Sequence, residues 1–290
     1  MIDWMKYRLV YFLISGIIIA AGVYGLIVWG LPLGLDFKGG ALLEYKIERE
    51  ISTEEATQKI EEKGIEVTSV QRIGADSYLF RLGGIDADKR ESIKNVLGEI
   101  GGSVEELRFE SVGPSIGPEL VKKTIYALAI AAIAILVWIT IQFKSFKFGV
   151  SAVLAMLHDS LVLIGVYGLF GHFLGAEVDF LFVTAMLTIL SFSVHDTIVV
   201  YDRIRESQKK FGGSLYDLAN KAVTETMVRS LNNSFTIIFM LIALVLLGGT
   251  TIKWFAIALL IGTISGTYSS PFVAVPLLVT WDELQKRLKR

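Results

Sequence analysis

Long apolar runs separated by short charged stretches dominate the pattern of hydrophobic and polar positions along this chain. A helix rises ~1.5 Å per residue, so a run of about 20 residues crosses the ~30 Å hydrocarbon core of a bilayer. Six runs are long and apolar enough for this, and each predicts a membrane-spanning helix. The predicted spans are 9–31, 124–143, 148–170, 180–201, 230–247 and 254–280.

The segment between the first two spans, 32–119, has a different pattern, in which strand-like alternation is interrupted by helical start and stop signals. One helix is predicted over Ser52–Lys63, because its Ser precedes Glu54 and Glu55 and Gly64 follows it. The other predicted elements are strands at 41–47, 67–73, 77–82 and 104–110, a turn at Gly74-Ala75-Asp76, and a helix at 86–100. The order βαββαβ is that of a ferredoxin-like α+β domain, a fold that hosts many functions.

The predicted fold class is therefore a membrane α-helical protein with six transmembrane helices and one ferredoxin-like α+β domain. The helix after this domain opens a five-helix bundle at 120–290. Hydrophobic residues make up 53% of the 290 positions and mean hydropathy is +0.57, as expected for a membrane protein.

Lys and Arg predict the orientation of these spans. They gather in the tail 1–8, between the second and third spans, in 202–229 and at the C-terminal end, whereas the opposite short connections hold only Lys253. Short cytoplasmic connections carry the excess of basic residues. We therefore expect a multi-pass protein of the cell membrane with both termini in the cytoplasm and an extracytoplasmic α+β domain.

The cytoplasmic loop 202–229 contains its own helical pattern. Leu215, Leu218, Ala222 and Val223 recur at helical spacing, which predicts an amphipathic helix over Ser214–Thr226. Such a helix would lie at the membrane surface or against the bundle.

Several function classes are disfavoured by the sequence. The chain has no cysteine, which excludes disulfides and thiolate metal sites. No Gly-x-x-x-x-Gly-Lys-Ser/Thr motif occurs, so we expect no nucleotide binding, and the net charge of −1 gives no indication of nucleic acid. No catalytic or metal-ligating constellation is found in the α+β domain. We therefore expect neither an enzyme nor a protein that holds a cofactor or a metal.

Two His-Asp pairs, His158-Asp159 and His195-Asp196, lie within predicted spans. A carboxylate at the centre of a membrane helix costs about 2.5–3.5 kcal/mol, and such groups mark ion pathways, proton relays or buried pairs. Asp159 lies near the middle of its span, on a helix with a seam of small and polar residues that would face other helices. This seam consists of Ser151, Ala155, His158, Val162 and Gly165.

Asp196 lies beside a polar stripe on the next span, formed by Thr184, Thr188, Ser191 and His195. Arg229 opens the following span, so its side chain is expected to lie close to Asp196. Opposite charges would then stabilise each other, and protonation of Asp196 would release Arg229. The alternatives are a static buried ion pair that fixes helix register and, for Asp159, a carboxyl group bonded to Ser or Thr.

Other motifs have mainly structural interpretations. Gly39-Gly40 predicts a sharp backbone turn, and Gly262-x-x-x-Gly266 predicts close helix packing, followed by kinks at Pro271 and Pro276. Three charged residues at the end of the fourth span either hold it to a neighbouring helix or mark a solvated end. They are Asp202, Arg203 and Arg205.

Three stretches carry a resemblance to a known family: Gly34-Leu35-Asp36-Phe37-Lys38-Gly39-Gly40, Val112-Gly113-Pro114-Ser115-Ile116-Gly117, and the segment 194–206, which contains Asp-Arg-Ile-Arg-Glu. With six spans and one domain after the first, the chain resembles the SecF members of the SecD–SecF family, in the resistance–nodulation–division superfamily. The resemblance covers nearly the whole chain. Two features depart from the family pattern: His195 stands where Asn or Ser is more common, and the loop after Glu206 is slightly shorter.

The resemblance implies an accessory subunit of the Sec translocase that acts with a SecD-like partner, the protein-conducting channel and an unfolded exported polypeptide in the lipid bilayer. The resemblance implies that transmembrane charges at positions matching Asp196 and Arg229 conduct protons, and Asp159 and His195 join them as coupling candidates because they are ionisable groups within predicted spans. The coupling ion, proton or sodium, stays open. Half of a small-molecule or lipid exporter and a non-transporting channel scaffold are the alternative functions.

Overall fold

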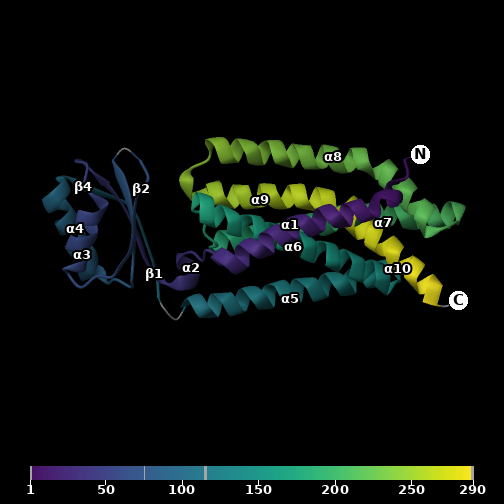
Figure 1. The fold of residues 1–290 in the computed structure, drawn as a ribbon, viewed down its shortest axis with the longest axis horizontal. Coiled ribbons are helices and arrows are strands. Elements are labelled where there is room, and N and C mark those ends of the chain that lie inside the picture. The colour runs from purple at the N-terminus through teal and green to yellow at the C-terminus, as the bar shows by residue number, and fades with distance from the viewer. Residues whose placement is uncertain (1, 75, 114–115, 289–290) are drawn as a thin grey trace. The chain divides into compact units, whose positions relative to one another are not determined.

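A computed structural model describes residues 2–74, 76–113 and 116–288 (Figure 1). The chain divides into a helical unit, Met1–Pro32 with Tyr126–Arg290, and an α+β unit, Leu33–Ile125. Parts of the predicted hairpin turn, of the motif before the second span and of the basic C-terminal end lie outside the described residues. These parts are Ala75, Pro114, Ser115, Lys289 and Arg290.

The α+β unit contains a four-stranded antiparallel sheet with the order β2-β3-β1-β4, which confirms the predicted ferredoxin-like fold. Its elements are α2 (Leu35–Lys38), β1 (Gly40–Ile47), α3 (Thr53–Glu61), β2 (Val67–Arg72), β3 (Ser77–Leu82), α4 (Ala87–Gly101) and β4 (Val104–Val112). Ser52 caps α3 by accepting from the Glu55 amide, and Asp86 caps α4 by accepting from the Lys89 amide. The helices therefore begin where their capping side chains satisfy free backbone amides.

A turn at Gly39 and Gly40 leads from α2 into β1. Their φ angles are 76° and 117°, in the region that glycine adopts most readily. A Cβ atom at position 40 would lie 2.5 Å from the carbonyl oxygen of Leu82 on the neighbouring strand. Both the backbone conformation and the close strand approach therefore require glycine at position 40.

Tyr45 and Tyr78 lie in the core of the α+β unit. The Tyr78 hydroxyl accepts from the amide of Ile51 and donates to its carbonyl, which holds the segment between β1 and α3. Burial, with the nearby carboxylate of Glu106, raises the pKa of Tyr45 above its usual value. Both rings therefore combine apolar packing with a hydroxyl that has a polar contact.

Six helices among the described residues are long and apolar enough to span a membrane, in agreement with the predicted number. The helical elements are η1 (Trp4–Tyr7), α1 (Arg8–Trp29), α5 (Ile116–Phe143), α6 (Phe146–Leu174), α7 (Phe180–Phe211), α8 (Leu215–Leu247), α9 (Thr250–Ser269), the π-helix η2 (Ser270–Ala274) and α10 (Val275–Leu288). The last three elements form one span. Pro271 lies in η2, which is the widened turn of this span.

The segment 202–229 is helical, and its description as a loop needs correction. Helix α7 continues to Phe211 and α8 begins at Leu215, so only Gly212–Ser214 lies outside a helix. The four apolar residues that predicted an amphipathic helix are all buried, so this part of α8 packs against the bundle. The dense charges of the segment lie on the outer faces of two long helices and do not end them.

Small residues let the helices of the bundle approach closely. Gly22 of α1 faces Gly165 of α6, and a Cβ atom on either glycine would lie 2.7 Å from the Cα atom of the other. On α9, a Cβ atom at Gly262 would overlap Ile189 of α7, and one at Gly266 would lie 3.2 Å from the Cβ atom of Ser193. Close backbone contact between small residues is a main source of helix association in membranes.

Replacing Tyr78 by Phe tests the role of its hydroxyl. The substitution leaves the amide and carbonyl of buried Ile51 without this partner, which costs about 1–3 kcal/mol. We expect faster hydrogen exchange in the segment between β1 and α3 of the full chain. Tyr24→Phe on an exposed ring is the matched control, and equal exchange in both variants would contradict this role.

Replacing Gly165 by Leu tests the α1–α6 contact. Its side chain would collide with the backbone of α1, and overpacking of this kind costs about 1–3 kcal/mol. We expect a lower midpoint of thermal unfolding for the detergent-solubilised protein. Gly16→Leu is the control, because a Cβ atom at Gly16 meets nothing within 4 Å. Equal midpoints for the two variants would show that the contact is unimportant.

Candidate functional site

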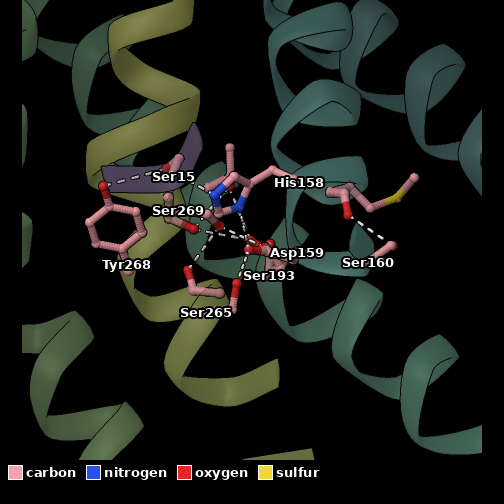
Figure 2. A network of polar contacts seen from close by, with 12 residues as sticks. Ser15, His158, Asp159, Ser160, Ser193, Ser265, Tyr268 and Ser269 are labelled. Carbon is pink, nitrogen blue, oxygen red and sulfur yellow. Dashed lines mark hydrogen bonds and ion pairs between the residues drawn. The ribbon is translucent and has the colours of Figure 1, made fainter. Parts of the chain in front are cut away.

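The carboxylate of Asp159 lies at the centre of a polar network inside the helical unit (Figure 2). Asp159 is 0% exposed, on α6. Three serine hydroxyls donate to it: Ser193 of α7 to Oδ2 at 2.5 Å, Ser265 of α9 to Oδ1 at 2.6 Å, and Ser269 of α9 to Oδ2 at 2.6 Å. Three helices thus meet at one carboxylate.

Helix geometry and small residues explain how these hydroxyls reach Asp159. Ser265 and Ser269 are four residues apart, so they lie on one face of α9. Gly266, between them, packs against Ser193, so α7 and α9 approach closely enough for hydroxyls from both helices to bond one side chain. The Gly262-x-x-x-Gly266 motif therefore contributes to the site by bringing these helices together.

His158 extends the network to α1. Its Nδ1 atom lies 3.1 Å from Oδ1 of Asp159, and its Nε2 atom lies 2.9 Å from the Ser15 hydroxyl. Ser15 lies 3.5 Å from the Tyr268 hydroxyl, which donates to the carbonyl of Tyr11 at 2.9 Å. Figure 2 shows His158 between Asp159 and Ser15, with Tyr268 next to Ser15.

Asp196 of α7 forms a second buried acidic site. It is 4% exposed, and its carboxylate accepts a hydrogen bond from the Ser230 hydroxyl of α8. Asp196 follows Ser193 by three residues, so it lies one turn along the same side of α7. Helix α7 thus connects the two sites, because it donates to Asp159 through Ser193 and carries Asp196.

The structure does not bring all the predicted site residues into contact. Arg229 and His195 are exposed, and among the described residues Arg229 forms neither an ion pair nor a side-chain hydrogen bond. Ser230, the neighbour of Arg229, is the partner of Asp196. The Asp196–Arg229 interaction therefore stays a prediction. The predicted seam on α6 is buried, whereas the polar stripe on α7 is exposed.

The charged residues at the end of α7 join neighbouring helices. Arg203 pairs with Glu225 of α8 at 2.5 Å, and Arg205 donates to the carbonyl of Gln142 of α5 at 2.8 Å. Arg205 also pairs with Asp202 at 2.6 Å. These contacts favour the structural interpretation in which the charges hold α7 to its neighbours.

Serine donors to Asp159 are the arrangement expected in the alternative of a carboxyl group bonded to Ser or Thr, but sequence reasoning identified none of the serines that donate to either acid. Ser193 and Ser230 stood in no recognised pattern, and Ser265 and Ser269 lie beside Gly262-x-x-x-Gly266, which was interpreted only as a packing motif. A signal for the latter pair exists, because two serines four residues apart in an apolar span place two donors on one face. His158 was assigned no role, although its neighbour Asp159 was a candidate.

The chemistry of the network is that of proton or cation binding. Carboxylates, hydroxyls and imidazole bind and exchange protons, and hard cations prefer oxygen ligands. Among the described residues there is no group of three or more His, Cys, Asp or Glu side chains that could hold a metal ion. The arrangement thus supports ion handling inside a helix bundle.

Comparisons with known proteins identify the family to which the chain is similar. The family model "Protein export membrane protein SecD/SecF, C-terminal" matches residues 92–284. The protein translocase subunit SecF of Thermobaculum terrenum is 42% identical, over 97% of this chain and 94% of the relative. SecDF of Bacillus subtilis is 31% identical, over 98% of this chain and 39% of the relative.

A solved structure shows the same fold. The crystal structure of SecDF from Thermus thermophilus matches with a TM-score of 0.84 at 29% sequence identity. The match covers 97% of this chain and 39% of the SecDF chain, so this chain spans about two fifths of that protein. The family consists of translocase membrane subunits and not of catalytic enzymes. The chain therefore belongs to the SecD/SecF family of protein-export membrane proteins, as a multi-pass protein of the SecF type.

Proposed function

We propose that this SecF-type chain acts with a SecD-like subunit and the Sec protein-conducting channel, and uses a transmembrane proton gradient to drive export of unfolded polypeptide. The fused SecDF relatives support the SecD-like partner, because this chain matches 39% of the length of one of them. The observation that carries ion coupling is the presence of two buried carboxylates, Asp159 and Asp196, inside one helix bundle.

Charge balance links these carboxylates to ions. Among the described residues, neither Asp159 nor Asp196 forms an ion pair with Lys or Arg, and only His158 offers a titratable cation within bonding distance of either. An ionised carboxylate in this setting relies on hydrogen bonds for its stability, and a proton or cation from outside removes its charge. Binding and release of an ion at these positions would therefore change the hydrogen bonds that join α6, α7, α8 and α9.

The exposed polar stripe of α7 supports a partner in the membrane. Thr184, Thr188, Ser191 and His195 lie on a membrane-spanning helix but are exposed in this chain. Polar residues in a membrane usually face other protein segments or water-filled cavities. We infer that the SecD-like subunit covers this stripe and that His195 lies at that interface.

We infer that Asp196 alternates between two states during the proposed cycle, and that Arg229 is its partner in the second state. Arg229 lies next to Ser230, which donates to Asp196. In the described state Asp196 is bonded to Ser230. In the second state an ionised Asp196 turns to Arg229, whose opposite charge favours ionisation. Alternation between the two partners would shift α7 against α8.

The distribution of Lys and Arg supports an orientation with both termini in the cytoplasm and the α+β unit outside. Helix α1 is continuous in sequence with this unit through residues 30–34, and β4 is followed directly by α5, so α1 and α5 are the two covalent connections between the bundle and the domain. We infer that the domain binds the emerging polypeptide and limits its backward movement.

Asp196→Asn tests this proposal. The amide cannot ionise at physiological pH, so we expect loss of most of the gradient-dependent increase in export, by about tenfold or more. The measurement is export of a secreted reporter into vesicles that contain the chain and its SecD-like partner, with and without a proton gradient. A separate arm with a sodium gradient identifies the coupling ion.

Two further variants sharpen the test. Ser230→Ala removes one donor to Asp196 and should reduce the response to the gradient without abolishing it, whereas Arg229→Met should abolish it. Asp88→Asn on the exposed face of α4 is the matched control and should behave as wild type. A wild-type response from both Asp196→Asn and Arg229→Met would overturn the proposal.

A further inference from the structure

We propose that His158 and Asp159 together hold one exchangeable proton inside the membrane, and that this proton adds a contact between α1 and α9 through Ser15 and Tyr268. The inference rests on the proposed function and adds a second proton site, with His158 as the residue that links it to α1. Its basis is the position of His158, which contacts the Asp159 carboxylate with one ring nitrogen and the Ser15 hydroxyl with the other.

The donors and acceptors in this chain of hydrogen bonds indicate where the exchangeable proton lies. With Asp159 ionised, its Oδ1 atom can only accept from Nδ1 of His158 at 3.1 Å, so this nitrogen carries a hydrogen. The Tyr268 hydroxyl donates to the Tyr11 carbonyl, so toward Ser15 it accepts. When Ser15 points its single hydrogen at Tyr268, its oxygen must accept from Nε2 of His158. With Asp159 ionised, the complete chain of contacts therefore places a hydrogen on both ring nitrogens of His158, which makes the ring an imidazolium.

Loss of that proton changes the contact with α1. A neutral ring keeps its hydrogen on Nδ1 for Asp159, and Nε2 becomes an acceptor. The Ser15 hydroxyl then turns to Nε2 and releases Tyr268. One proton thus decides whether Ser15 connects α1 to both α6 and α9 or to α6 alone.

This proton sets the net charge of the His158–Asp159 pair. With it, the His158–Asp159 pair is neutral, and without it the pair has a buried negative charge. Among the described residues, the network around this pair includes one other titratable side chain, Tyr268 of α9, and Asp196 lies one turn from Ser193 on α7; neither supplies a positive charge. Three serine donors stabilise the carboxylate in either state, so the site can release the proton without losing its structure.

Packing around α1 allows the helix to respond. Gly22 and Gly165 hold α1 against α6 seven residues from Ser15, about two helical turns away. Beside the polar contact lies a groove of about 390 Å³ whose lining includes Ile18, Val162 and His158. The glycine contact therefore holds α1 against α6, and the groove lies beside the polar contact that changes with the proton.

The protonation of His158 can be measured directly, because the chain has three histidines. In the full chain with its SecD-like partner, nitrogen NMR of labelled histidine should show both ring nitrogens of His158 protonated near neutral pH. Asp159→Asn should convert this signal to a singly protonated ring, and His158→Asn assigns it by removing it. Asp196→Asn is the control and should leave the signal unchanged. A singly protonated ring in the wild-type protein at all tested pH values would overturn the proposal.

Cross-linking tests the link to α1. The chain lacks cysteine, so Ile18→Cys and Ile264→Cys introduce a single pair in the groove, on α1 and α9, the two helices whose Ser15–Tyr268 contact changes with the proton. In vesicles, we expect a proton gradient to change the cross-linking yield by about twofold or more, because it shifts the populations of the two states. The yield should become independent of the gradient with Ser15→Ala, a small substitution that preserves packing, and with His158→Asn.

The outcomes separate this inference from the proposed function. If Asp196→Asn abolishes gradient-driven export but the Ser15→Ala and His158→Asn backgrounds keep a gradient-dependent yield, the proposed function stands and the inference is wrong. If export is independent of the gradient in the wild type, the proposed function is wrong. The NMR measurement then still decides whether His158 and Asp159 hold the proton.

Discussion

The burial of a carboxylate in a membrane bundle is the constraint on which the rest of the helical unit depends. Asp159 has no access to water, and the serine hydroxyls of α7 and α9 replace it as hydrogen-bond donors. Those donors reach Asp159 only because Gly262 and Gly266 allow α9 to approach α7 closely. Charge stabilisation and helix packing are thus one requirement, since separation of the helices would also leave a carboxylate uncompensated in the membrane.

Helix α7 has two faces with different roles. Ser193 and Asp196 face the bundle and bond to α6 and α8, whereas the opposite stripe around His195 is polar and exposed. In a soluble protein such a stripe would simply face water. In a membrane helix it identifies the side where another protein segment belongs, so one helix connects the internal network to the expected subunit interface.

Periodicity and charge predicted the six spans, the α+β fold and the two acidic positions, because burial in lipid and strand alternation leave direct patterns in a sequence. The partners of the acids could not be predicted in the same way. Ser230 and Arg229 are neighbours in the chain, and only the rotation of α8 decides which of them faces Asp196. Likewise, Ser265 and Ser269 look like small packing residues until the helix that faces them is known. The charges of 202–229 led to the incorrect prediction of a loop for a related reason, because polar residues on an exposed helical face resemble those of a loop.

The short connection between α7 and α8 has a mechanical consequence. These helices have 32 and 33 residues, which at ~1.5 Å per residue is ~50 Å of helix each, while the hydrocarbon core is only ~30 Å thick. Both helices therefore extend well beyond the lipid as a stiff hairpin, closed by Gly212–Ser214 and braced by the Arg203–Glu225 ion pair. Trp4 and Met5 of η1 bond to Thr224 and Asn220 in the part of α8 next to the tip, so a tilt at the level of Asp196 would carry the N-terminal end of the chain along with the hairpin.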